Sequence, residues 1–274
     1  MQSVGYLGPE GTFSHLVARK RFGTTARLVP CEGIYEIFQF IKAGRGRLGV
    51  VPVENSSGGA IFETIDCLVE NAGHLHIREE LSLNVQLALL GRRNQPVQNL
   101  YSHFVPLQHC QSWIRAHLPG VKTHEVASTA KAAERAAQEP NAAALGTRDA
   151  GRRLGLDVLK FPVETDAPNI TEFLVVGASP KPAPRSTKTS LLVMLENRPG
   201  SLFDFLSAFK ASNVNLTRLL SRPIIGQPKS YLFVVDIQGS PARENVKNAI
   251  AAARRAAARL MPLGVYPVRK MYAS

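Results

Sequence analysis

The stretch Val50-Val51-Pro52-Val53-Glu54-Asn55-Ser56-Ser57-Gly58-Gly59 decides how this chain is organised. An apolar run, Leu48–Val53, ends there in small polar residues and two glycines. Residues at helical spacing follow it: Ile61, Thr64, Ile65 and Leu68. This order predicts a buried strand, a tight turn and a helix. Strand ends and helix starts in α/β sheets attract anions, so Asn55, Ser56 and Ser57 are candidates for one wall of a carboxylate site. Alternatively, Asn55 or Ser56 only caps the helix.

Composition and hydropathy are those of an ordinary globular protein. The 274 residues are 45% hydrophobic and 20% charged, and this length is sufficient for two domains. No apolar run approaches the roughly 18 residues that a membrane span needs. Residues 1–6 lack the basic and long apolar regions of a signal peptide. We therefore expect a cytoplasmic protein with no membrane partner.

The cysteines and histidines predict neither a disulfide framework nor a metal centre. Cys31, Cys67 and Cys110 are odd in number and far apart, and the seven histidines form no ligand pattern. The net charge of +12 is uneven: residues 187–274 contain 13 Lys or Arg against 4 Asp or Glu. Such a basic segment can bind nucleic acid. Because no aromatic-rich or known binding motif accompanies it, we expect no nucleic-acid partner.

The first two thirds of the chain alternate between strand and helix patterns, which predicts α/β lobes with helices on the sheet faces. The run Leu81–Leu90 is expected to be one crossing strand, and residues 103–117 one helix. In the second half of this region, Ser128 and Thr147 again follow strands and precede helices. The pattern predicts two α/β lobes that face each other across a cleft.

A proline-rich segment, Ser179–Ser186, separates these lobes from the C-terminal part. The patterns after it give the order βαββαβ, with helices expected near 202–209 and 241–260, which is the ferredoxin-like plan. The expected division is therefore a two-lobed domain at residues 1–178, a linker at 179–186, and a ferredoxin-like domain at 187–274.

Several motifs occur in the order and at the separations of one known family. In the first domain they are Gly8-Pro9-Glu10-Gly11-Thr12-Phe13-Ser14-His15, Val51-Pro52-Val53-Glu54-Asn55-Ser56, Ser128-Thr129-Ala130, and Asn169-Ile170-Thr171-Glu172-Phe173-Leu174-Val175-Val176. In the second they are Arg198-Pro199-Gly200-Ser201-Leu202, Asn215-Leu216-Thr217 and Leu220-Ser221-Arg222-Pro223. Over nearly its whole length, the chain resembles prephenate dehydratases with a C-terminal ACT domain.

The resemblance implies a two-lobed catalytic domain, similar to periplasmic binding proteins, with its site between the lobes. It implies decarboxylative dehydration of prephenate to phenylpyruvate in L-phenylalanine biosynthesis, without a metal or organic cofactor. It also implies that the ACT domain binds L-phenylalanine as an allosteric inhibitor. Members of the family assemble through this domain as homodimers or homotetramers.

The same resemblance assigns residues to the substrate site. Thr171 matches the family threonine that donates a proton to the leaving hydroxyl, although on its own it is an ordinary threonine at a strand start. The residues implied to hold the substrate or line the cleft are Thr12, Phe13, Asn55, Ser56, Ser57, Ser128, Thr129 and Phe173. Hydroxyl and amide donors of this kind can hold two carboxylates and polarise the leaving group.

The implied effector site is at the start of the first helix of the ACT domain. Pro199, Gly200, Ser201 and Leu202 form that start, where glycine allows close approach of the backbone to a carboxylate. Asn213 and Asn215, at the far end of the same helix, are expected to contact the ammonium group from a neighbouring subunit. Alternatively, Gly200 serves only the turn and the ACT domain only dimerises.

The chain departs from the family pattern at several positions. Glu172 replaces an arginine, Val105 a glutamine, and Gln86 lies where a strand histidine is usual. Gly58 and Leu220 replace acidic residues. If Glu172 faces the cleft, it repels a dianionic substrate. Two alternatives therefore stay open: a divergent enzyme acting on a related cyclohexadiene acid, such as a non-aromatising prephenate decarboxylase or a lyase, and a catalytically decayed amino-acid-binding regulator.

Overall fold

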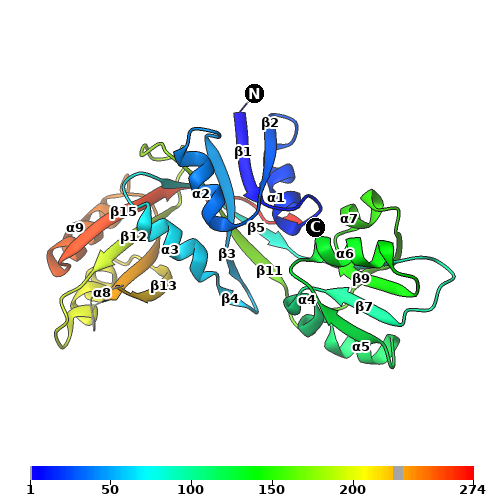
Figure 1. The fold of residues 1–274 in the computed structure, drawn as a ribbon. Helices are drawn as coiled ribbons and strands as arrows, with labels where there is room; N and C mark the ends of the chain where they lie inside the picture. Colours follow the sequence, from blue (N-terminus) through cyan, green and yellow to red (C-terminus); the bar gives the residue numbers. More distant parts are fainter. Residues whose placement is uncertain (1, 225–230) are drawn as a thin grey trace. The chain divides into compact units, whose positions relative to one another are not determined.

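The computed structural model describes residues 2–224 and 231–274 and divides into two compact units (Figure 1). The first unit contains the chain up to Ile61, then Leu81–Phe173 and Lys270–Ser274. The second contains Phe62–Glu80 and Leu174–Arg269. Within the second unit, residues 179–187 form neither helix nor strand.

The first lobe of the first unit is built on a seven-stranded sheet in the order β16-β5-β11-β3-β1-β2, with β4 paired to β3. Its strands are β1 (Gln2–Leu7), β2 (Ala26–Cys31), β3 (Leu48–Asn55), β4 (Gly59–Ala60), β5 (His76–Asn84), β11 (Ile170–Gly177) and β16 (Tyr272–Ala273). The helices α1 (Phe13–Phe22) and α2 (Ile34–Lys42) pack against β1, β2 and β3. The division between the units falls within β5 and β11.

The second lobe is built on a five-stranded sheet in the order β10-β6-β9-β7-β8. Its strands are β6 (Leu87–Gly91), β7 (Asn99–Ser102), β8 (Lys122–Glu125), β9 (Ala142–Gly146) and β10 (Asp157–Val163). Its helices are α4 (Phe104–His109), α5 (Gln111–His117), α6 (Thr129–Gln138) and α7 (Arg148–Arg153). Buried alanines on α6 let this helix pack closely on β7 and β9.

The sequence explains why β3 and α2 form where they do. Val50, Val51 and Val53 are each at most 1% exposed, so both faces of β3 are covered, as a continuous apolar run in a parallel sheet requires. On α2, Ile34, Ile37, Phe38 and Ile41 follow one another at helical spacing and are buried, which places the apolar face of the helix on the sheet. The N-caps of α1, α6 and α7 are Thr12, Ser128 and Thr147, and the sequence predicts the last two.

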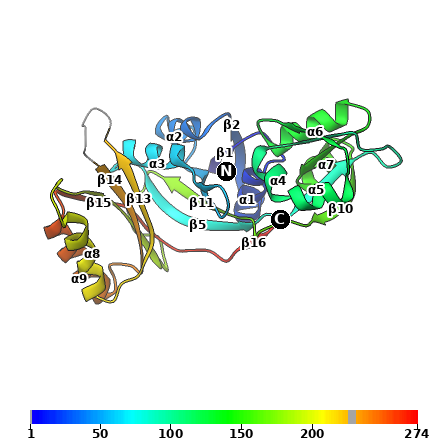
Figure 2. The same cartoon turned by 90° about the horizontal axis from the view of Figure 1, so that it is seen from below.

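The second unit contains α3 (Phe62–Glu70) and an antiparallel sheet in the order β13-β14-β12-β15. The strands are β12 (Lys188–Met194), β13 (Leu216–Pro223), β14 (Tyr231–Gln238) and β15 (Arg259–Tyr266). The helices α8 (Ser201–Ala211) and α9 (Glu244–Ala256) lie side by side against it (Figure 2). Phe205 and Phe209 of α8 are fully buried in the core that the helices share with the sheet. The predicted fold class, two α/β lobes followed by a βαββαβ domain, is confirmed.

The sheet of the second unit also carries a buried polar cluster. Asp236 accepts hydrogen bonds at 2.5 Å from the Ser190 hydroxyl and from Arg218 Nη1, and Ser190 is 2.6 Å from the Tyr266 hydroxyl. Burial raises the pKa of Tyr266 well above its ordinary value, so this phenol stays protonated. Buried charges are tolerated when they are paired and hydrogen-bonded in this way.

The helix predicted after the Val50–Gly59 stretch is present as α3, and it begins at Phe62 because β4 first pairs back on β3 as a hairpin. Two other local predictions are wrong. The run 81–90 contains the end of β5 and most of β6, separated at Val85–Gln86, where the chain passes from one sheet to the other. The helix expected at 103–117 is two helices divided at Cys110.

No helix within residues 2–224 and 231–274 is long and apolar enough to span a membrane. In the same part of the chain, no group of three or more His, Cys, Asp or Glu side chains is arranged to hold a metal ion.

Candidate functional site

A cavity of about 430 Å³ in the first unit brings most of the predicted site residues together. From the first lobe, it is lined by Thr12, Phe13, Asn55, Thr171 and Phe173. From the second lobe, it is lined by Ser128 and Thr129. We call this the central cavity. Seven of the nine predicted catalytic and substrate residues therefore lie around one space.

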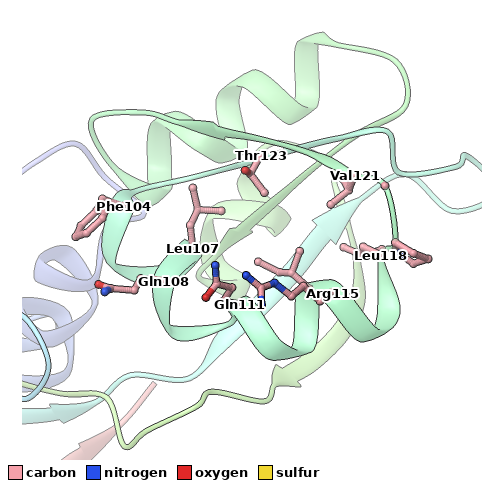
Figure 3. Close-up of a pocket in the computed structure, with 11 residues that line it drawn as sticks. Phe104, Leu107, Gln108, Gln111, Arg115, Leu118, Val121 and Thr123 are labelled. Carbon is pink, nitrogen blue, oxygen red and sulfur yellow. The ribbon is translucent and has the colours of Figure 1, made fainter.

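A larger hollow, of about 590 Å³, is lined by residues of α4, of α5 and of the segment that leads into β8 (Figure 3). Its lining includes Phe104, Leu107 and Leu118, with one cation, Arg115. It contains none of the residues that the motifs single out. We therefore place the candidate site in the central cavity in spite of its smaller volume.

Two helix starts face the central cavity, one from each lobe. The Thr12 hydroxyl caps α1 by accepting from the His15 amide at 3.1 Å. The Ser128 hydroxyl caps α6 by accepting from the Lys131 amide at 3.1 Å. The first amides of each helix have no partner within the helix, and the helix dipole makes each start partly positive. Two such starts in one cavity suit a ligand with two carboxylates.

The Asn55 side chain fixes the orientation of the Thr171 hydroxyl. Asn55 Oδ1 accepts from the amides of Ser57 and Gly58, both at 3.0 Å, so its Nδ2 faces the other way. There Nδ2 donates to Thr171 Oγ1 and to Asn169 Oδ1, both at 2.9 Å. Because the Thr171 oxygen accepts from Asn55, its own proton remains available to a group in the cavity.

Ser56 and Ser57 do not line the cavity. The Ser56 hydroxyl donates to Pro168 O at 2.8 Å and accepts from the Ile170 amide at 3.0 Å. Ser57 is exposed and contributes its backbone amide to Asn55. Both residues hold the β3–β4 turn against the segment before β11, which supports Thr171 indirectly. Neither caps a helix, because α3 begins only at Phe62.

Glu172 lies between two cavity residues but is not one of them. Thr171 and Phe173 line the cavity, and Glu172 does not. Successive side chains of a strand point to opposite faces, so the carboxylate of Glu172 is directed away from the ligand space. The replacement of the family arginine therefore places no negative charge in the cavity.

The sequence reasoning missed several lining residues. Lys131 contributes a cation three residues after the Ser128 cap, and its ammonium is 2.8 Å from Glu134. Asn169, 4% exposed, and His103 also line the cavity. A signal for Lys131 was available, since the first turn of a helix lies beside its cap.

The loop between β1 and α1 is held by a buried histidine. His15 Nδ1 accepts from the Gly11 amide at 3.1 Å, and the ring stacks on Tyr6 at 5.1 Å between centroids. Burial lowers the pKa of His15 below its ordinary value, which favours the neutral ring that this contact needs. The contact orders the loop that leads to Thr12.

The residues of the expected effector site lie at the two ends of α8. Gly200 is the N-cap, with φ of 84°, and the buried Ser201 hydroxyl beside it has no hydrogen-bond partner in the described residues. Asn213 and Asn215 line a separate hollow of about 460 Å³ at the other end. Eleven helical residues span about 16 Å. One small ligand therefore cannot touch both ends within one chain.

Comparisons with known proteins identify the family of both domains. The family model "Prephenate dehydratase" matches residues 4–181, and the model "ACT domain" matches residues 189–255. The bifunctional chorismate mutase/prephenate dehydratase of Stutzerimonas stutzeri is 36% identical, covering 96% of this chain and 73% of that protein. The prephenate dehydratase of Mycobacterium marinum is 31% identical, covering 100% of this chain and 91% of that protein.

Solved structures with the same fold include two prephenate dehydratases. The Arthrobacter aurescens protein, in complex with L-Phe, has a TM-score of 0.87 and 28% identity, covering 97% of this chain and 89% of that one. The Staphylococcus aureus protein has a TM-score of 0.84 and 26% identity, covering 97% and 100%. A structure described as GqqA, a novel type of quorum-quenching acylase, has a TM-score of 0.88 and 25% identity, covering 98% of both chains.

Proposed function

The chain belongs to the prephenate dehydratase family with an ACT domain, and we propose how the residues of its central cavity perform the reaction of this family. The enzyme converts prephenate to phenylpyruvate in phenylalanine biosynthesis. The C–C bond to the ring carboxylate breaks to release carbon dioxide, and its electron pair enters the ring. The C–O bond to the ring hydroxyl breaks, and the departing oxygen takes up a proton to leave as water. The observation that carries the proposal is the Asn55–Thr171 hydrogen bond inside a cavity with two helix starts.

The two helix starts hold the two carboxylates of prephenate. The amides at the start of α1, beside Thr12, bind one carboxylate, and those at the start of α6, beside Ser128 and Thr129, bind the other. Neutral donors suit the carboxylate that leaves, because a tight ion pair would stabilise it before the reaction. We therefore assign Lys131 to the carboxylate that the product keeps.

Thr171 assists departure of the ring hydroxyl. With its oxygen occupied by Asn55 Nδ2, the Thr171 hydroxyl donates to the leaving oxygen as negative charge develops on it. Formation of an aromatic ring drives the reaction, so orientation and polarisation by the protein are sufficient. Phe13 and Phe173 supply apolar walls that keep the ring of the substrate in place.

Incubation of the purified protein with prephenate and identification of the product tests this function. Phenylpyruvate is the expected product. A diene acid would instead indicate a non-aromatising decarboxylase or lyase on the same fold. Absence of any product would indicate a catalytically decayed amino-acid-binding regulator. The fold alone does not make this choice, since an acylase shares it.

Glu172→Gln is expected to leave the Michaelis constant for prephenate within about twofold of wild type, because exposed or outward-facing charges contribute little to binding. The side chain lies on the strand face opposite Thr171 and Phe173. Steady-state kinetics at matched ionic strength provide the measurement. A tighter Michaelis constant would mean that the carboxylate does repel the substrate, as it would if it faced the cavity.

Lys131→Gln is expected to raise the Michaelis constant for prephenate about fivefold, the factor that corresponds to roughly 1 kcal/mol of a partly exposed ion pair. The turnover number should change little, because the carboxylate concerned does not react. Glu134→Gln is the matched control: it removes the present partner of Lys131 and should not raise the Michaelis constant. If both variants behave alike, Lys131 does not contact the substrate.

Regulation is proposed to follow the family as well. We assign residues 1–178 to catalysis, 179–186 to a linker and 187–274 to the ACT domain, which binds L-phenylalanine as effector. The amides at Pro199–Leu202 and the unpartnered Ser201 hydroxyl receive the carboxylate. Asn213 and Asn215 of a second copy contact the ammonium group, since one chain cannot bring both ends of α8 to one ligand. The protein is then a cytoplasmic homodimer or homotetramer.

Gly200→Val is expected to abolish the binding of phenylalanine measured by calorimetry. A Cβ at Gly200 meets no atom within 4 Å, so the effect comes from the φ of 84°, which a β-branched residue does not adopt without strain. Gly120→Val is the matched control, because Gly120 has a φ of 78° and equally open surroundings in the first unit. Absence of binding to wild type at about 1 mM, which corresponds to only about −4 kcal/mol, contradicts the proposal. If the Gly200→Val variant still binds phenylalanine, the effector site is not at the start of α8.

A further inference from the structure

A second cavity in the first unit is lined mainly by cations. It has a volume of about 220 Å³ and is formed between α1 of the first lobe and α7 of the second. Arg19 and Lys20 come from α1, and Arg148 and Arg152 from α7. Asp149 is the only carboxylate side chain among its lining residues. We call this the basic cavity.

Two of these four cations, Lys20 and Arg152, have no side-chain counter-charge among the described residues. Asp149 is engaged by Arg19 Nη1 at 3.1 Å. In the part of the chain that the structure describes, Lys20 and Arg152 form no ion pair with a carboxylate side chain, and Arg148 is hydrogen-bonded to Ser274 O. Arg148 and Arg152 are four residues apart on α7 and so lie on the same side of the helix. The side chains that line the basic cavity therefore include several cations that repel one another.

Arg148 is already held in place by its neighbours. Its guanidinium lies 3.9 Å from the centroid of the Phe161 ring, and its Nη2 donates to Ser274 O at 3.4 Å. Stacking and a hydrogen bond restrict the side chain, so a ligand would have less conformational entropy to remove. A planar guanidinium fixed in this way can offer two parallel donors to a phosphate or a carboxylate.

We propose that the basic cavity binds a small anion with two or more negative charges, carried by a phosphate group or by several carboxylates. Such a ligand pairs with Lys20, Arg148 and Arg152 and relieves their mutual repulsion. The wall also contains the polar residues Gln86, Thr147 and Ser274. The apolar side chains of Leu16 and Phe161 can face a short carbon skeleton of the ligand. This site is separate from the central cavity and does not depend on the reaction proposed there.

The bound anion also strengthens the junction between the lobes. The two lobes are joined here already by Thr147 Oγ1, which donates to Gly11 O at 2.7 Å, and by two ion pairs, Glu10 with Arg153 and Arg19 with Asp149. The same α1 that lines the basic cavity begins in the central cavity at Thr12. An anion held by both helices thus adds a fourth bridge beside the start of the substrate site.

Calorimetry and thermal unfolding with inorganic phosphate and with citrate test the proposal. For wild type at low ionic strength we expect a dissociation constant below about 1 mM for at least one of the two anions. Sodium chloride at matched ionic strength should not reproduce the rise in unfolding temperature, because general screening does not need a site. Preference for phosphate or for citrate distinguishes a phosphorylated ligand from a polycarboxylate.

Variants localise the binding. Arg152→Gln, in an exposed side chain without other contacts, should weaken binding at least about tenfold, and Arg148→Gln with Arg152→Gln should weaken it further. Arg115→Gln removes the same charge from the second lobe outside the cavity and should leave binding unchanged. Equal binding by wild type and the double variant, loss in the control, or no binding of either anion at about 10 mM would overturn the proposal. Competition with prephenate would also overturn the proposal. If phosphate inhibits wild type and the double variant equally and only by competing with prephenate, it occupies the central cavity and not the basic cavity.

Discussion

Thr171→Ala is expected to lower the turnover number for prephenate by about a hundredfold or more, within the range for loss of a positioned proton donor. The substitution removes the hydroxyl that Asn55 orients towards the leaving group. The two helix starts that hold the carboxylates are not touched, so the Michaelis constant should change much less than the turnover number. Steady-state kinetics with spectroscopic detection of phenylpyruvate provide the measurement.

Two further substitutions at this position separate chemistry from packing. Thr171→Ser keeps a hydroxyl and should retain most of the activity, whereas Thr171→Val keeps the shape and should be as impaired as the alanine variant. Unfolding temperatures should stay close to wild type for all three, since Thr171 is only half-buried. Activity of the alanine variant within about threefold of wild type would remove Thr171 from the mechanism.

Local signals were sufficient for much of the fold. Ser128 and Thr147 cap the helices that the sequence predicts after them, and Thr12, one of two candidates with Gly11, caps α1. A side-chain cap satisfies amides within its own turn, so its signal does not depend on distant contacts. The βαββαβ order of the second unit was likewise readable from successive apolar periods and turns.

Structural features that depend on partners distant in the sequence could not be predicted from the sequence. The apolar run 81–90 is continuous in sequence, and only the positions of the two sheets require the break at Val85–Gln86. The hairpin partner β4 and the edge strand β16 have two residues each, too few for any periodicity. Both exist because a neighbouring strand offers free backbone groups.

The orientation of Glu172 could have been derived from the sequence. Once Thr171 and Phe173 are both assigned to the site, strand alternation places Glu172 on the opposite face. The departure from the family arginine then carries no penalty in the cavity, as the lining residues show. By contrast, the placement of Ser56 outside the cavity depends on its hydrogen bonds to Pro168 and Ile170, more than a hundred residues away.

Asn55→Asp is expected to lower the turnover number about a hundredfold, comparable to removing the Thr171 hydroxyl itself. The new carboxylate can still accept from the amides of Ser57 and Gly58, so the turn keeps its geometry. Its other oxygen, however, meets Thr171 Oγ1 as an acceptor where Asn55 Nδ2 is a donor. The Thr171 proton then turns towards the carboxylate and away from the substrate. The added negative charge also raises the Michaelis constant for a dianion.

A double-mutant cycle with Thr171→Ala distinguishes this mechanism from a general disturbance of the cavity. If Asn55 acts on turnover through the Thr171 hydroxyl, Asn55→Asp should cost little further turnover in a chain that already lacks that hydroxyl. Its effect on the Michaelis constant should persist there, because repulsion of the substrate does not involve Thr171. Lowering the pH should restore part of the turnover of the single variant, since protonation turns the introduced carboxyl group back into a donor. Independent, multiplying losses of turnover in the double variant would show instead that Asn55 and Thr171 act on the substrate separately.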